Sequence, residues 1–261
     1  MINTVLSLMV RNNIRGFDRT MTLLVRLGYK QRIKIKNRYG AWFSLDPFNY
    51  IDRIVLKEGY YESEVLECIL TEIKTNEVFW DIGANIGLHS ITLNHIKRNV
   101  QVFSFEPFPG IMNCLLKNAE LNKATIHKIA IGLSDKTNLL PIVFVKGNSG
   151  MTTLLPWDGL KFNDQVSIIT LTIDDLIEKY SIPQPQVIKI DAEGSELNIF
   201  NGAHNLLKGE QLRAIIFEAG NDFLITSSKL KSLLTEYGFT FSMLTREEET
   251  THNLSKFLAS R

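Results

Sequence analysis

The stretch Asp81–Ser90, DIGANIGLHS, constrains the fold more than any other part of this chain. The apolar run Val78–Trp80 precedes it and predicts a strand that ends on an acidic residue. Gly83 and Gly87 then predict a tight turn, and a helix begins at once. A second apolar run, QVFSFE, ends on Glu106. Strands that alternate with helices in this way predict a parallel sheet with helices on both faces.

The turn and Glu106 together predict a site for a nucleoside-containing cofactor. Glycines let the backbone approach a ligand closely, because a Cβ there would collide with it. A carboxylate at the tip of the next strand accepts hydrogen bonds from the two ribose hydroxyls. A glycine-rich turn also occurs in βα units that bind no ligand, but an acidic residue in register favours the binding interpretation. We expect Glu106 to bind the ribose and Pro107 to fix the chain as it leaves the strand.

The residues of the turn favour one class of cofactor. Dinucleotide sites use the pattern G-x-G-x-x-G and aim a helix N-terminus at a pyrophosphate. Here Asn85 replaces the second glycine, and Asp81 lies at the strand tip, where its charge would repel a phosphate. A ligand with a ribose, no phosphate and a cationic amino group fits better, and S-adenosylmethionine is such a ligand. We expect Gly83, Asn85 and Gly87 to line its methionine and ribose side, and Asp81 to orient the loop or receive the amino group.

Three motifs carry a resemblance to a known family. DIGANIG, then FSFEP, then IKIDAEGSE at 188–196 followed by Gly202–Ala203, resemble the FkbM family of S-adenosylmethionine-dependent methyltransferases. The order and spacing of the motifs are family-like, and the resemblance covers roughly residues 40–260. One departure is His89, where many members have an aromatic residue. The resemblance implies a class I methyltransferase fold, O-methylation of a hydroxyl on a sugar, glycan or secondary metabolite, and a contact of Glu62 with the methionine end of the cofactor. Glu62 would otherwise complement the dipole at the start of a helix.

The motif DAEGSE contains the residues that we expect to carry the chemistry. Methyl transfer is a displacement at carbon with a sulfonium as leaving group, so the protein mainly supplies proximity and alignment. An alcohol acceptor is a poor nucleophile until its proton is removed. Asp191 is our first candidate for that base and Glu193 the second. Glu193 and Glu196 would otherwise only supply acidic charge to a first helical turn, which is the interpretation that we prefer for Glu196.

Four predicted strands end in a carboxylate on the same edge of the sheet, where open α/β sheets bind their ligands. Because unpaired buried charge is costly, each should have a partner, a ligand or a perturbed pKa. Asp191 with Glu218, Asn221 or Asp222 would give an all-oxygen site for Mg²⁺. Carboxylates alone do not define a metal site, however, so we predict none and do not expect Mg²⁺ to be needed. The four carboxylates at the strand ends are those of Asp81, Glu106, Asp191 and Glu218.

Charge and composition divide the chain into two parts. Residues 1–57 hold eleven Lys/Arg and three acids, a charge of +8, which leaves −7 for residues 58–261. We predict a basic N-terminal extension over 1–57, with a helix over about 1–28 and a β-hairpin over 31–45, and a cofactor-binding domain over 58–261. The extension would contact a membrane surface, a lipid-linked phosphate or an acidic partner, or its amphipathic helix would pack on the core. We favour the packing interpretation.

The 58–261 segment predicts a doubly wound, mostly parallel seven-stranded sheet, Rossmann-like, whose final strand pairs antiparallel with its predecessor. A loop rich in Gly, Asn and Ser is expected at 147–150, and the region 147–165, with Met151, Trp157 and Phe162, should contact the acceptor or pack locally. The expected strands are 78–82, 101–106, 124–130, 138–145, 166–172, 186–191, 212–218, 239–244 and 254–259. The expected helices are 62–73, 86–97, 109–122, 173–180, 195–207 and 226–237.

Cysteines and apolar runs bear on the compartment. Cys68 and Cys114 form no CxxC, which favours a reducing cytosol. The start MINTVLSLMV lacks the basic region and cleavage site of a signal peptide, and no apolar run approaches the roughly 20 residues that span a bilayer. We therefore expect a cytoplasmic protein. Any membrane contact would be peripheral and would go through the N-terminal extension.

Three other functions stay open from the sequence. An NAD-dependent oxidoreductase would use a similar sheet, although Asn85 argues against it. A nucleic-acid methyltransferase should carry a basic channel, whereas residues 58–261 are net acidic and contain no NPPY-type motif. A non-catalytic scaffold that kept the fold is the third. We expect a small-molecule or glycan acceptor and no nucleic acid; the sequence indicates no oligomeric state.

Overall fold

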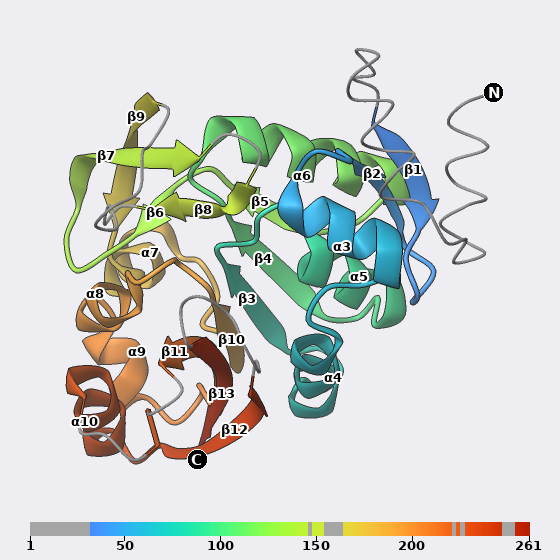
Figure 1. Cartoon of the computed structure of the whole chain (residues 1–261). Helices are drawn as coiled ribbons and strands as arrows, with labels where there is room; N and C mark the ends of the chain where they lie inside the picture. The colour runs from blue at the N-terminus through green and yellow to red at the C-terminus, as the bar shows by residue number, and fades with distance from the viewer. Residues whose placement is uncertain (1–31, 146–147, 154–163, 221–222, 225–227, 247–253) are drawn as a thin grey trace.

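A mostly parallel sheet of seven strands lies at the centre of the computed structural model, which describes residues 32–145, 148–153, 164–220, 223–224, 228–246 and 254–261 (Figure 1). All neighbouring strands are parallel except β13, which is antiparallel to both of its neighbours. The predicted doubly wound sheet and its antiparallel final strand are confirmed. In spatial order the strands are β12 (Thr240–Arg246), β13 (Leu254–Ser260), β11 (Ala214–Gly220), β10 (Val187–Ile190), β3 (Val78–Ile82), β4 (Gln101–Phe105) and β5 (His127–Ile129).

Two hydrophobic cores cover the two faces of this sheet, because successive side chains of a strand point to opposite faces. In β3, Phe79 belongs to one core and Trp80 to the other. Helices α3 (Tyr50–Glu58), α4 (Ser63–Glu72), α5 (Leu88–Ile96) and α6 (Pro109–Asn122) contribute to the first core. Helices α7 (Ile173–Tyr180), α8 (Glu196–Asn201), α9 (His204–Lys208) and α10 (Lys229–Glu236) contribute to the second.

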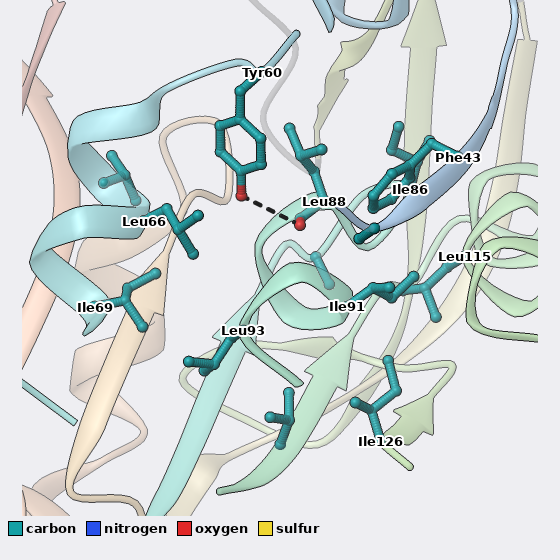
Figure 2. Packing of buried hydrophobic residues seen from close by; sticks show 14 of the residues in the cluster. Phe43, Tyr60, Leu66, Ile69, Ile86, Leu88, Ile91, Leu93, Leu115 and Ile126 are labelled. Carbon is teal, nitrogen blue, oxygen red and sulfur yellow. Dashed lines mark hydrogen bonds between the residues drawn. The ribbon is translucent and has the colours of Figure 1, made fainter. Parts of the chain in front are cut away.

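The predicted hairpin is confirmed as β1 (Ile33–Lys36) and β2 (Trp42–Leu45), which pair antiparallel. Its buried side chains join the first core, where Phe43, Ile91 and Leu115 lie among the labelled apolar residues of Figure 2. The Tyr60 hydroxyl donates a hydrogen bond to the Leu88 carbonyl in the same core. The described part of the basic extension therefore packs with α4–α6. The predicted helix at 1–28 lies outside the described residues.

A second sheet of four strands, in the order β6-β9-β7-β8, lies beside the main one. The prediction of a loop at 147–150 was wrong where the structure describes it, since β8 begins at Asn148 and pairs with β7. Pairing with a long neighbouring strand outweighs the weak strand preference of Asn, Ser and Gly. The strands are β6 (Gly132–Leu133), β7 (Asn138–Val145), β8 (Asn148–Thr153) and β9 (Asp164–Leu171).

Two helices differ from the sequence prediction. Helix α3 was not predicted, although Asn49 caps its first turn by accepting from the Asp52 N–H and Gly59 ends it at a φ of 82°. The helix predicted over 195–207 is two helices, α8 and α9, separated by Gly202–Ala203. A Cβ on Gly202 would lie 2.2 Å from the Ser134 carbonyl oxygen. The helix is therefore interrupted where the chain passes close to another backbone segment.

Membrane crossing finds no support in the described ranges: none of their helices combines the length and the apolar character that a bilayer span requires.

Gly83→Ala and Gly194→Ala test how tightly the chain packs at the end of β3. Both glycines have a positive φ, +74° and +92°, so both variants lose about 1–2 kcal/mol to backbone strain. A Cβ on Gly83 would also lie 1.9 Å from the Asp191 carbonyl oxygen, whereas a Cβ on Gly194 meets nothing within 4 Å. We expect Gly83→Ala to lose more than about 3 kcal/mol in urea unfolding. Equal losses in the two variants would contradict this packing.

Candidate active site

The turn after β3 has an unusual backbone, with positive φ at Gly83, Asn85 and Gly87. Gly83 leaves room for the Asp191 carbonyl of the next strand end, and Gly87 leaves room for the side chains of Ile91 and Leu115. The packing of the chain itself therefore requires Gly83, whereas at Gly87 the φ of +83° favours glycine. Their contact with a cofactor stays a prediction.

Glu106, directly after β4, joins this turn to the next one. Its Oε2 accepts from the Asn85 N–H at 3.0 Å, and its Oε1 accepts from the Phe108 N–H at 2.9 Å. A carboxylate has about four lone-pair sites, so two stay available for further donors. Burial raises the pKa of Glu106 to about 7, although the Phe108 and Asn85 N–H groups lower it. Pro107 follows and leads into α6.

Asp81 is fully buried and fixes the start of α5 to the sheet. It pairs in register with Ser104 of β4 and Lys189 of β10. The Ser90 hydroxyl donates to Asp81 Oδ2 at 2.6 Å, and the Ser104 hydroxyl donates to Ser90 Oγ at 2.8 Å. These contacts favour the loop-orienting role that the sequence offered for Asp81.

Lys189 was not singled out from the sequence, and it connects Asp81 with Asp191. Its side chain is buried, with Nζ 3.6 Å from Asp81 Oδ1 and 3.5 Å from Asp191 Oδ2. Nζ also donates to the Gly83 carbonyl oxygen at 3.2 Å. The turn after β3 and the end of β10 are thus held by one ammonium group.

Lys256 of β13 is the second lysine that the sequence analysis missed. Its Nζ lies 2.6 Å from Glu218 Oε2, 2.9 Å from Glu62 Oε1 and 3.4 Å from Asp191 Oδ2. A signal was present for Lys189, which interrupts the apolar strand VIKI of β10, whereas Lys256 lies in the mixed strand LSKFLAS of β13 and gives a weaker one. The ion-pair partners of both lysines depend on the order of strands in the sheet, which the local sequence pattern does not show.

Glu62 lies inside this ionic cluster. It has a left-handed backbone with φ 56° before α4 and makes no capping hydrogen bond with its side chain. Its Oε2 lies 3.4 Å from His89 Nε2, and His89 Nδ1 lies 3.1 Å from the Tyr60 hydroxyl. Burial alone would raise the pKa of Glu62, but Lys256 and His89 outweigh it and hold the pKa below its usual value. His89, the departure from the family pattern, thus has a defined partner.

Three acidic residues near Lys256 differ in their pKa. Burial opposes ionisation of Asp191, yet the ammonium groups of Lys256 and Lys189 keep its pKa below the usual value. Burial and the Asp191 charge raise the pKa of Glu218 to about 7, against the pull of Lys256. Burial and the charges of Asp191 and Glu218 raise the pKa of Glu193 to about 9.

Glu196 serves the turn before α8. Its Oε1 accepts from the Ala192 N–H at 3.0 Å and from the Gly194 N–H at 3.3 Å. The structural role that the sequence favoured for Glu196 agrees with these contacts.

Metal ligation has no geometric support in the part of the chain that the structure describes, where no group of three or more His, Cys, Asp or Glu is placed to hold an ion. The Lys256 ammonium lies within ion-pair distance of both Asp191 and Glu218. Asn221 and Asp222, the other magnesium candidates, lie outside the described residues. So do Trp157, Phe162 and the side chain of Met151 from the predicted acceptor region.

Glu106→Gln tests the raised pKa of Glu106 without any ligand. The folded protein holds this proton more tightly than the unfolded chain, whose carboxyl has the ordinary pKa of 4.5. The stabilisation from protonation is complete below that pH and is lost as the pH rises through about 7. We therefore expect the unfolding free energy of the wild type, relative to Glu106→Gln, to fall by about 2–3 kcal/mol between about pH 5 and pH 8.

Chemical denaturation across this range measures the difference, with the exposed Glu120→Gln of α6 as the matched control. A difference between wild type and Glu106→Gln that is constant with pH would contradict the raised pKa.

The chain is similar in sequence to known methyltransferases. The family model described as "Methyltransferase FkbM domain" matches residues 81–241. The hexuronic acid methyltransferase AglP of Haloferax volcanii is 28% identical over 203 residues, which cover 76% of this chain and 81% of that protein. Methyltransferase sdnD of Sordaria araneosa is 23% identical over 199 residues, 65% of this chain and 76% of that protein.

Among solved structures, that of M. jannaschii TYW2 in complex with AdoMet aligns over 89% of this chain and 86% of the TYW2 chain, with 14% identity and a TM-score of 0.49. The family match extends over more than half of the sequence, and the chain therefore belongs to the FkbM methyltransferase family.

Proposed function

We propose that this protein transfers a methyl group from S-adenosylmethionine to an oxygen of a sugar, glycan or secondary metabolite. The observation that carries the proposal is the Glu106 carboxylate, which two backbone N–H groups hold at the end of β4. Membership of the FkbM family supports methyl transfer. The printed name of the Haloferax relative, a hexuronic acid methyltransferase, supports a sugar as the acceptor class.

The residues present fit the cofactor. The two remaining lone-pair sites of Glu106 match the two hydroxyl donors of a ribose. The turn that would lie beside the ribose is fixed by backbone bonds, since the Gly83 and Ala84 N–H groups both donate to the Phe105 carbonyl. Glu62, which the family resemblance places at the methionine end, is held by Lys256 and His89.

The charge of the site also favours S-adenosylmethionine over a dinucleotide. Six carboxyl groups and two lysine ammonium groups gather at this edge in the described ranges, and with Glu193 in its neutral form five carboxyl groups are still available to carry negative charge. This excess of carboxyl groups over ammonium groups would repel a pyrophosphate, whereas it would attract a sulfonium and an α-ammonium. The carboxyl groups belong to Glu62, Asp81, Glu106, Asp191, Glu193 and Glu218.

The carboxylates at the ends of β10 and β11 would prepare the acceptor. When bound, the cofactor would supply a methyl group from its positively charged sulfur, and the rest of the cofactor would then be the leaving group, a neutral thioether. An acceptor hydroxyl must lose its proton as its oxygen forms the new bond to carbon. Glu218 has the pKa best matched to accept that proton at neutral pH, and Asp191, ionised throughout, would orient the hydroxyl.

Glu193 is a poorer candidate for the general base than the sequence suggested, because it is already protonated at neutral pH. With a pKa of about 9 it carries its proton at neutral pH, so it would donate a hydrogen bond rather than accept one. Asp191, the first candidate base from the sequence, instead orients the acceptor in this proposal, and Glu218 takes the role of base from Asp191 and Glu193.

Glu106→Gln tests the cofactor assignment. We expect the wild type to bind S-adenosylmethionine and S-adenosylhomocysteine but not NAD in calorimetry. The variant should bind both ligands at least about tenfold more weakly, because the amide accepts at only one of its two terminal atoms. Glu120→Gln should match the wild type. Binding of NAD alone, or unchanged affinity in Glu106→Gln, would contradict the assignment.

Glu218→Gln tests the base. Methyl transfer to a panel of uronic acids, neutral sugars and glycosides is followed with labelled cofactor, with and without a metal chelator. The wild-type rate should rise with pH through about 7, because the base must lose its own proton before it accepts another. Glu218→Gln should lower kcat by about 100-fold and remove this rise, while leaving the affinity for S-adenosylmethionine within a few fold. A wild-type pH profile in the variant would exclude Glu218 as the base.

A further inference from the structure

Lys256 joins three elements that are far apart in the sequence. It stands opposite Glu218 in the pairing of β13 with β11. Its ammonium reaches Asp191 after β10 and Glu62 before α4. An ammonium has three N–H donors, and here three carboxylates lie within ion-pair distance. Its side chain is only 5% exposed, so water solvates its charge only slightly and the carboxylates must stabilise it.

This cluster is continuous with the turn that would hold the cofactor. Asp191 Oδ2, a partner of Lys256, also lies 3.5 Å from Lys189 Nζ. Lys189 in turn donates to the Gly83 carbonyl oxygen, and Gly83 packs against the Asp191 backbone. The charge on Lys256 is therefore linked to the turn through Asp191 and Lys189. By the family resemblance, Glu62, another partner of Lys256, contacts the methionine end of the cofactor.

We propose that Lys256 is a positioning residue of the cofactor site that also sets its charge, and that it thereby limits how strongly the site prefers cationic S-adenosylmethionine over neutral S-adenosylhomocysteine. The inference rests on the proposed function. Without Lys256, the carboxylates of Glu62, Asp191 and Glu218 would lose their shared cation, and the site would attract a sulfonium more strongly. Partial protonation of these groups would reduce the change but not reverse its sign.

The test measures Kd for both ligands in full-length wild type, Lys256→Met and Lys256→Arg, at one mildly alkaline pH. The ratio of Kd for S-adenosylhomocysteine to Kd for S-adenosylmethionine should rise about fivefold in Lys256→Met, as expected for one charge acting over roughly 10 Å in a partly buried site. Lys256→Arg, which keeps the charge, should keep the wild-type ratio.

Lys97→Met is the matched control for loss of a structural lysine. Lys97 Nζ donates to the carbonyl oxygens of Leu70 and Ile73, each at 2.7 Å. Its removal should lower the melting temperature without changing the ratio. Should Lys256→Met fail to fold, Lys256→Gln keeps two N–H donors and removes the charge.

Equal weakening of both ligands in the neutral Lys256 variants, with an unchanged ratio, would overturn the inference and leave Lys256 a purely structural role. A wild type that binds neither ligand would instead refute the proposed function. The two failures are therefore distinguishable.

Discussion

The pairing of buried lysines with buried carboxylates is the interaction on which this end of the sheet depends. Lys189 and Lys256 are each about 5% exposed and lie among acids that the strand ends bring together. Burying a charge costs several kcal/mol, and only close partners offset that cost. Without the acids, burial would lower the pKa of both lysines, and without the lysines the acids would repel one another.

The same arrangement gives carboxyl groups of similar chemistry different protonation states. Asp191 contacts both lysines and stays ionised, whereas Glu193, which feels mainly burial and the charges of Asp191 and Glu218, keeps its proton at neutral pH. Glu106 is set apart from both, since backbone N–H groups hold its carboxylate. Burial and the balance of neighbouring charges, rather than residue type, decide what each acid can do.

The central sheet followed from the sequence because its signals are local. Apolar runs, glycine turns and helical periodicity predicted the seven strands of the central sheet and the place of Glu106. Lys256 was missed because its partners come from strand order, and β13 lies between β12 and β11 rather than beyond them. The break between α8 and α9 was missed for a similar reason, since it follows from contact with Ser134 far away in the chain. Local pattern predicted the elements, and tertiary contacts decided what surrounds the site.

The position of β13 has a consequence for the order of assembly. The strand is antiparallel and separates β12 from β11, so β12 cannot complete the sheet by joining β11 directly. A chain in which β3, β4, β10 and β11 have already paired still lacks the cation that Glu62, Asp191 and Glu218 share. Insertion of one strand then closes the sheet edge and balances the charge in the same event. The charge cluster is therefore incomplete until β13 has paired with β11, so the cluster and this part of the sheet form together.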